Sequence, residues 1–165
     1  MTQQFPVTMV NHVAIEIAAP PDAVWRAIQE DYVEAKKFRE VGTFEPLDDP
    51  AAVLGGYRMR IVHGDVVDER LVRFTEIDHQ ARRLSAYADY LTVPVGGMGV
   101  WVTYHAQEAP RGGTRYAIDC HARLHIDKPA GGSKADFAEA ITTMTRGADA
   151  SLIAYLERVK ASLEG

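Results

Sequence analysis

The fold is decided by residues 133–164, which read SKADFAEAITTMTRGADASLIAYLERVKASLE. Apolar residues recur there every three or four positions, and this spacing predicts one long amphipathic helix with a single buried stripe. Ser133 and Asp136 have the spacing of a weak capping box at its start, and the stripe from Phe137 to Leu163 extends along about 40 Å of helix. The stripe consists of Phe137, Ile141, Met144, Ala148, Leu152, Tyr155, Leu156, Val159 and Leu163. So long a helix has to lie across a wide partner.

The predicted partner is a curved antiparallel sheet of seven strands. Apolar and polar residues alternate with a period of two, which is typical of strands that bury one face. Short turns rich in Gly, Pro and Asp separate most of these segments, so antiparallel pairing of consecutive strands is the simplest topology. The predicted strands are 10–18, 41–47, 57–63, 66–77, 83–91, 99–108 and 114–126. Because such a sheet has one apolar face, the long helix is its natural cover.

Two short helices are predicted after the first strand. Pro20 and Pro21 start the first helix, since a proline there loses no hydrogen bond, and Asp22 suits the positive helix N-terminus. The second helix covers 32–38, with Lys36 and Lys37 exposed. The complete pattern predicts an α+β fold, and a chain of 165 residues is expected to form one domain, 1–165.

Composition excludes several classes of function. The chain has 18 Lys and Arg against 23 Asp and Glu, a net charge of −5, and its basic residues are scattered, so no nucleic-acid partner is predicted. No apolar run approaches the roughly 20 residues that span a bilayer, so no membrane insertion is predicted. A single cysteine and the absence of a signal-peptide pattern at the start predict a cytoplasmic protein. No sequence feature marks an oligomer interface.

The order of elements resembles the helix-grip fold of the START-like (SRPBCC) superfamily. Residues 18–25, AAPPDAVW, resemble the opening motif of its bacterial polyketide cyclase/dehydrase members, and 69–71, ERL, resemble one of their strands. Residues 151–156, SLIAYL, lie where the last helix of those proteins closes the fold. The resemblance covers nearly the whole chain. It implies a cavity between sheet and long helix, which relatives use for lipids, sterols, plant hormones, polyketides or other aromatic molecules.

Strand parity selects the residues expected to face that cavity, because neighbouring residues point to opposite faces. The third strand is expected to present Tyr57, Met59, Ile61 and, at the cavity mouth, His63. The fourth is expected to present Val67, Glu69 and Leu71, with Arg70 in solvent. In plant abscisic acid receptors, which are distant relatives, the Glu of the similar tripeptide faces the pocket. That comparison implies the same direction for Glu69.

Periodicity leaves the direction of the next two strands open. The same comparison implies that Tyr87 and Asp89 line the pocket and form a polar cluster with Glu69, although these side chains would equally suit a solvent-facing hairpin. For the sixth strand we favour Met98, Val100 and Tyr104 as the inner set. The seventh strand presents Cys120 on its apolar face. The long helix is expected to close the pocket with Ile141, Met144, Thr145, Ala148 and Leu152, for which core packing is an equal explanation.

The candidate catalytic residues are Glu69, His63 and Tyr87. A buried carboxyl has a raised pKa and can act as a general acid or base near neutral pH, whereas a structural Glu69 would only bridge strands or hold water. No metal site and no cofactor are predicted. His121 and His125 are about 13 Å apart on one strand, too far for a shared metal, and Cys120 and His121 point to opposite faces.

Three functions are consistent with these features. The first is binding of a small hydrophobic or aromatic molecule, polyketide-like or lipid-like, in the central cavity. The second is a cofactor-independent cyclase, dehydratase or lyase that uses acid-base residues of the cavity. The third is a co-chaperone-type interaction module, which predicts a filled interior and a sizeable exposed apolar patch. An open cavity without a buried acid would remove only the second.

Overall fold

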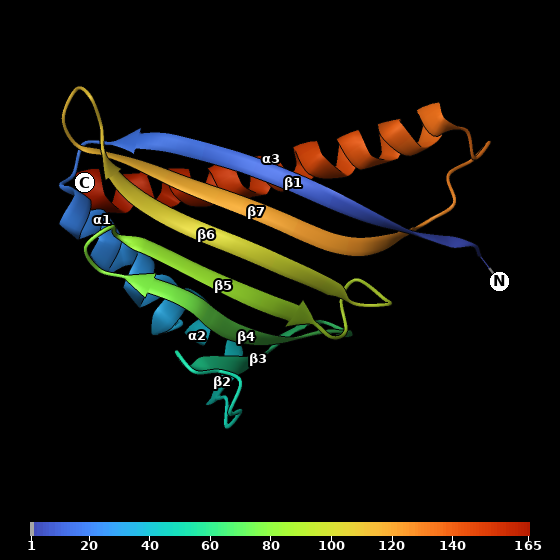
Figure 1. Ribbon diagram of the computed structural model, residues 1–165, viewed down its shortest axis with the longest axis horizontal. Helices are drawn as coiled ribbons and strands as arrows, with labels where there is room; N and C mark the ends of the chain where they lie inside the picture. The colour runs from blue at the N-terminus through green and yellow to red at the C-terminus, as the bar shows by residue number, and fades with distance from the viewer. Residues whose placement is uncertain (1) are drawn as a thin grey trace.

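The computed structural model describes residues 2–165 and shows a seven-stranded antiparallel sheet with a long C-terminal helix (Figure 1). The strands are β1 (Gln4–Ile17), β2 (Gly42–Pro46), β3 (Gly56–His63), β4 (Val66–Asp78), β5 (Arg83–Tyr90), β6 (Met98–Glu108) and β7 (Thr114–Asp127). The helices are α1 (Pro21–Ile28), the π-helical turn η1 (Gln29–Val33), α2 (Lys36–Arg39) and α3 (Lys134–Glu164). The predicted α+β helix-grip architecture is confirmed.

The sheet order is β1-β7-β6-β5-β4-β3-β2, so one consecutive pairing is missing. β1 pairs along its whole length with β7 and not with β2. The consecutive antiparallel pairing expected of the strands that short turns join, β2 to β7, is confirmed. The segment α1-η1-α2 carries the chain from one edge of the sheet to the other, which leaves β1 free to pair with the last strand (Figure 1).

The predicted second short helix is split into two pieces. Residues Gln29–Val33 form the π-helical turn, and α2 follows only at Lys36. Between them Ala35 has a φ of 57°, in the left-handed region that a non-glycine residue rarely adopts, and this residue ends the first piece. β1 also begins at Gln4, six residues before the predicted start at Val10.

Helix α3 begins with the predicted capping box. Asp136 N–H donates to the Ser133 hydroxyl, and Ser133 N–H donates to the Asp136 carboxylate. The helix packs mainly on β1, and its buried residues, Tyr155, Leu156 and Val159, all lie in its C-terminal third. In the part of the chain that the structure describes, no helix is both long and apolar enough to cross a membrane.

Helix α1 covers the core at the same end as the C-terminal turns of α3. Val24, Trp25 and Ile28 are all buried, and α1 packs on β6 and β7. The concave face of the sheet is therefore covered at one end by α1 and the C-terminal turns of α3, while η1 and α2 reach toward β2. This arrangement leaves a hollow over the middle strands.

Candidate functional site

The hollow is a partly open pocket of about 330 Å³ between the sheet, η1, α2 and α3. Its walls are mostly apolar and its polar groups are few. The lining residues are Tyr32, Lys37, Phe38, Tyr57, Met59, Arg70, Val72, Phe74, Leu84, Ala86, Ala88, Tyr90, Val100, Val102, Tyr104, Cys120 and Leu152. Apolar walls with a small number of convergent polar groups are typical of small-molecule sites.

Arg70 points into this pocket, so its predicted exposure to solvent is wrong. Arg70 shares the inner face of β4 with the buried Val72 and Phe74. A β-bulge between Phe74 and Glu76 then reverses the parity, because Ile77 beyond it pairs with the fully buried Leu84. Strict alternation along 66–77 cannot describe such a strand.

Arg70 is held by two neighbours on the same face of the sheet. Its guanidinium is paired with Asp68, with Nε 2.9 Å from Oδ1 and Nη2 on Oδ2. Its guanidinium carbon lies 4.0 Å from the centre of the Tyr90 ring, a cation–π contact. Arg70 is therefore a fixed, charge-compensated donor group at the pocket wall.

Lys37 is the second cation of the pocket, and its predicted exposure is also wrong. Its Nζ donates to Tyr32 Oη at 3.1 Å and lies 3.7 Å from the centre of the Tyr155 ring. Burial lowers the pKa of Lys37 to about 8, against a weaker opposing effect of Asp31. At neutral pH a measurable fraction of this amine is therefore uncharged.

Four tyrosines complete the polar lining: Tyr32, Tyr57, Tyr90 and Tyr104. The Tyr32 and Tyr104 rings stack at a centroid distance of 4.0 Å. Burial raises the pKa of all four phenols, so each keeps its proton near neutral pH and can both donate and accept hydrogen bonds. Burial also raises the pKa of the Cys120 thiol to about 11, which makes it a poor nucleophile.

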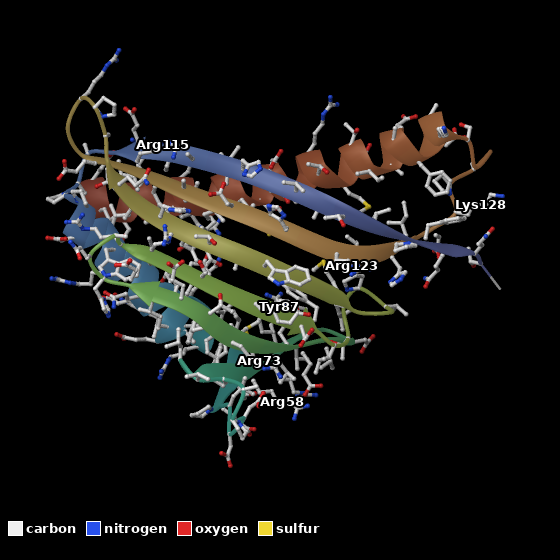
Figure 2. All side chains as sticks on the ribbon, in the orientation of Figure 1. Arg58, Arg73, Tyr87, Arg115, Arg123 and Lys128 are labelled. Atoms are coloured by element: carbon white, nitrogen blue, oxygen red, sulfur yellow. The ribbon has the colours of Figure 1, made fainter. Side chains whose placement is uncertain are left out.

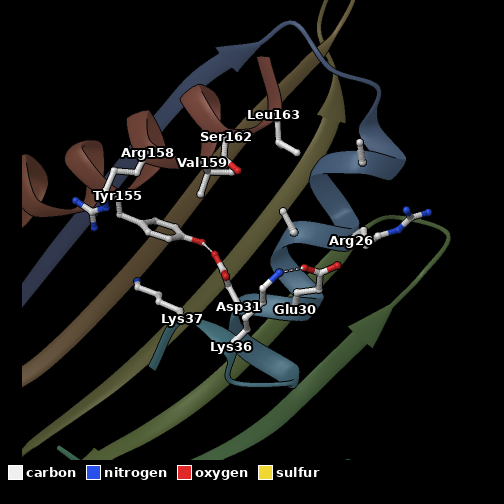
Figure 3. Close-up of a pocket in the computed structure, with 12 residues that line it drawn as sticks. Arg26, Glu30, Asp31, Lys36, Lys37, Tyr155, Arg158, Val159, Ser162 and Leu163 are labelled. Atoms are coloured by element: carbon white, nitrogen blue, oxygen red, sulfur yellow. Dashed lines mark hydrogen bonds and ion pairs between the residues drawn. The ribbon is translucent and has the colours of Figure 1, made fainter. Parts of the chain in front are cut away.

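An open groove adjoins the pocket on the helical side (Figure 3). The groove lies between α1, η1, α2 and the end of α3, and Lys37 and Tyr155 line it. Tyr155 Oη donates to Asp31 Oδ2 at 2.7 Å, and Lys36 Nζ donates to Glu30 Oε2 at 2.6 Å. Lys37 borders both the groove and the pocket, so it stands at the boundary between them.

Several predicted ligand-binding residues do line the pocket: Tyr57, Met59, Val100, Tyr104 and Cys120. Ile61 is buried in the core, and Met98 packs against that core from the same face, but neither borders the pocket.

The expected acid does not face the pocket. Glu69 lies on the outer face of β4, where its Oε1 is 3.4 Å from Arg58 Nε. Val67 and Leu71 share that outer face, opposite Arg70, so their expected inward direction is wrong as well. His63 ends β3 as an exposed residue away from the pocket lining.

Tyr87 and Asp89 do form a polar cluster, but on the outer face of β5. Tyr87 Oη donates to Asp89 Oδ1 at 2.5 Å, and Arg73 Nη1 donates to Asp89 Oδ2 at 3.1 Å. The Tyr87 ring packs on Trp101 at 4.7 Å, and Trp101 is half exposed. Figure 2 shows Tyr87, Arg73 and Arg58 on three adjacent strands. The expected grouping with Glu69 inside the pocket is therefore wrong.

The long helix contributes one residue, Leu152, to the pocket. Ile141, Met144, Thr145 and Ala148 are partly exposed and do not border it. The reason is the path of α3, which packs along the edge strand β1 and not over the middle strands. Within residues 2–165, no cluster of three or more His, Cys, Asp or Glu is arranged for a metal ion.

The comparisons with known proteins establish the fold of the chain. No protein-family model and no curated protein matches this chain. Among solved structures, the Zhui aromatase/cyclase from Streptomyces superposes with a TM-score of 0.61 at 16% identity, covering 96% of this chain and 94% of that one. The chain has the helix-grip fold of START-like proteins.

Two further helix-grip structures show how widely the fold is shared. Norcoclaurine synthase from Thalictrum flavum, in complex with dopamine and hydroxybenzaldehyde, has a TM-score of 0.53 at 21% identity, covering 86% of this chain and 88% of that one. Ara h 8.0201 has a TM-score of 0.56 at 11% identity, covering 92% of this chain and 99% of that one. Identities this low establish the helix-grip architecture, and the function has to be argued from the pocket.

Proposed function

We propose that the protein binds a small, partly aromatic molecule in the pocket between the sheet and helices α2 and α3. The observation that carries this proposal is the lining: about 330 Å³ bordered by apolar and aromatic side chains, with Arg70 and Lys37 as its charged groups. A partly enclosed apolar space of that size offers a small molecule extensive dispersion contacts. The aromatic side chains of Tyr32, Tyr90 and Tyr104 border this space and can contact the edges or faces of a planar ligand.

The polar groups of the pocket support recognition of an oxygen-bearing ligand. Arg70 is fixed by Asp68 and Tyr90, so its remaining N–H groups are preorganised donors. Tyr57 and Tyr104 keep their protons because burial raises both pKa values, and each can donate to a carbonyl, phenol or carboxylate oxygen. The complex of norcoclaurine synthase with dopamine and hydroxybenzaldehyde shows that this fold can hold small aromatic molecules.

The position of Glu69 favours a ligand-binding function over an enzyme in which Glu69 is the catalytic acid. That residue lies on the outer face, no carboxylate is among the described residues that line the pocket, and Asp68 is engaged by Arg70. A general acid or base must reach the reacting atom directly or through one water. The filled interior expected of an interaction module is equally at odds with the pocket.

The experiment is native mass spectrometry of the purified protein, followed by extraction of any bound molecule. Ala88→Phe places a ring in the pocket, and Ala150→Phe places the same ring on the exposed side of α3. We expect the bound mass, or uptake of fluorescent aromatic probes, to be lost in Ala88→Phe and kept in Ala150→Phe. A folded Ala88→Phe variant that binds as well as wild type would refute the proposal.

A further inference from the structure

Lys37 is the one cation of the pocket without a carboxylate partner among the described residues. Arg70 is paired with Asp68, and the neighbouring Lys36 with Glu30. None of the ion pairs formed within residues 2–165 includes Lys37. The nearby acid Asp31 accepts the Tyr155 hydroxyl at 2.7 Å. The Lys37 ammonium is left with one phenol oxygen and the faces of aromatic rings.

The surroundings of Lys37 partly compensate its charge. Its Nζ lies 3.7, 5.0 and 5.2 Å from the ring centres of Tyr155, Tyr32 and Phe38, and cation–π attraction at such distances is favourable. Burial nevertheless lowers the pKa of Lys37 to about 8. Repulsion by Arg158 of α3 and Arg70 of β4 also lowers it, whereas attraction by Asp31 raises it. A negative charge brought into the pocket would offset both the desolvation of the Lys37 ammonium and its repulsion by the two arginines.

The position of Lys37 allows that charge to come from a ligand. The residue borders the 330 Å³ pocket and the open groove of Figure 3 at the same time, so an anionic group can approach it from the solvent side. The apolar body of the same ligand would then lie against residues such as Val100 and Ala88. Arg70 is less suited to this task, because two of its N–H groups already hold Asp68.

We propose that the molecule bound in the pocket is an aromatic anion whose charged group pairs with Lys37 Nζ. This inference rests on the proposed function and specifies its ligand class: a ring system carrying a carboxylate, a sulfonate or an ionised phenol. Lys37 acts as the group that distinguishes acids from their neutral analogues. A charge pair inside a partly desolvated site also gives more discrimination than one on the surface.

The test uses two fluorescent probes with one ring skeleton, anilinonaphthalene sulfonate and the neutral phenylnaphthylamine. We expect Lys37→Met to weaken sulfonate binding by about tenfold or more, while the neutral probe changes by less than about twofold. Lys37→Arg should keep most of the sulfonate affinity because it keeps the charge. Lys36→Met is the matched control, since Lys36 is adjacent in sequence, 67% exposed and paired with Glu30.

The outcomes separate this inference from the proposed function. Equal loss of sulfonate affinity in Lys36→Met and Lys37→Met would indicate long-range surface attraction and overturn the role of Lys37. If Lys37→Met binds the sulfonate as well as wild type while Ala88→Phe binds neither probe, only the anion preference is overturned. Binding in the pocket would then stand. Binding of both probes to Ala88→Phe at wild-type affinity would instead overturn the proposed function itself.

Discussion

Two consecutive residues of β4, Glu69 and Arg70, belong to ion pairs of different character on opposite faces of the sheet. Arg58 and Glu69 form the outer pair, with side chains 50% and 27% exposed. Arg70 and Asp68 form the inner pair, with side chains 20% and 14% exposed. Water screens the outer pair and lowers its contribution to stability. Removing one member of the inner pair instead leaves the other charge unpaired in a poorly solvated site.

The inner pair should therefore be the one that matters for stability. We expect Arg70→Met to lower the free energy of unfolding by about 2 kcal/mol, because Asp68 keeps its charge without a partner. Arg58→Met should cost less than about 1 kcal/mol. Urea unfolding of both variants measures the difference. Equal losses would show that the two faces of β4 are solvated alike.

Lys37 gives a second prediction, for the pH dependence of stability. Its pKa is about 8 in the folded protein and 10.5 in its ordinary state, so between these values the unfolded chain binds more protons. Stability contributed by this residue therefore rises as pH rises from 8 to 10. We expect wild type to gain about 1 to 2 kcal/mol over Lys37→Met across that interval, allowing for its partial exposure. Urea unfolding of both proteins at the two pH values tests it, and a constant difference would contradict it.

At the level of elements, the sequence predicts which helices and strands exist better than it predicts which face of each strand is buried. All seven strands and the long helix are found, and all but the start of β1 lie within one or two residues of their predicted bounds, because period-two and period-3.6 patterns directly reflect one buried face. The buried face of β4 is not predicted, since the bulge after Phe74 reverses the alternation of side chains and the inner face carries the charged Asp68 and Arg70. Two charges that neutralise each other inside a pocket look, in sequence, like a solvent-facing pair.

The path of α3 along β1 depends on a contact that sequence spacing does not reveal. Asn11 of β1 is 1% exposed, and its Nδ2 donates to Asp149 Oδ1 at 2.8 Å and to the Thr145 carbonyl at 3.1 Å. This amide fixes the middle of the helix against the edge strand. It also explains why Met144 and Ala148, expected over the pocket, lie beside β1 and only partly buried.

Loss of that amide should loosen the helix. We expect Asn11→Ala to lower the free energy of unfolding by about 1 to 3 kcal/mol, because two partly buried hydrogen bonds are lost. Ser151→Ala removes an exposed helix bond to the Gly147 carbonyl and should change stability by less than about 0.5 kcal/mol. Hydrogen exchange of the α3 amides gives a local readout, and equal protection in the two variants would contradict the role of Asn11.

At the level of the whole molecule, the pocket arises from how the elements are connected. The α1-η1-α2 crossover frees β1 to pair with β7, and α3 follows β1, so the pocket over the middle strands is lined on its helical side by residues of the crossover and by Leu152. Lys37 and Tyr32 reach the pocket from that crossover. Their role could not be predicted from a two-residue or helical period, because the segment contains a π-helical turn and a left-handed Ala35.

The wall of the pocket and the packed core respond in opposite ways to the same added ring. Ala88 borders the pocket, whereas Ala106 is 1% exposed in the core cluster and borders no part of the pocket lining. We expect Ala88→Phe to raise the free energy of unfolding of the ligand-free protein by about 1 kcal/mol, as cavity-filling changes commonly do. Ala106→Phe should lower it by about 2 kcal/mol or more, because no space exists there for the ring. Urea unfolding of the two variants and of wild type, each freed of ligand, measures these changes. Destabilisation by both rings to the same extent would mean that the pocket closes in solution, and the site proposed for the ligand would be lost with it.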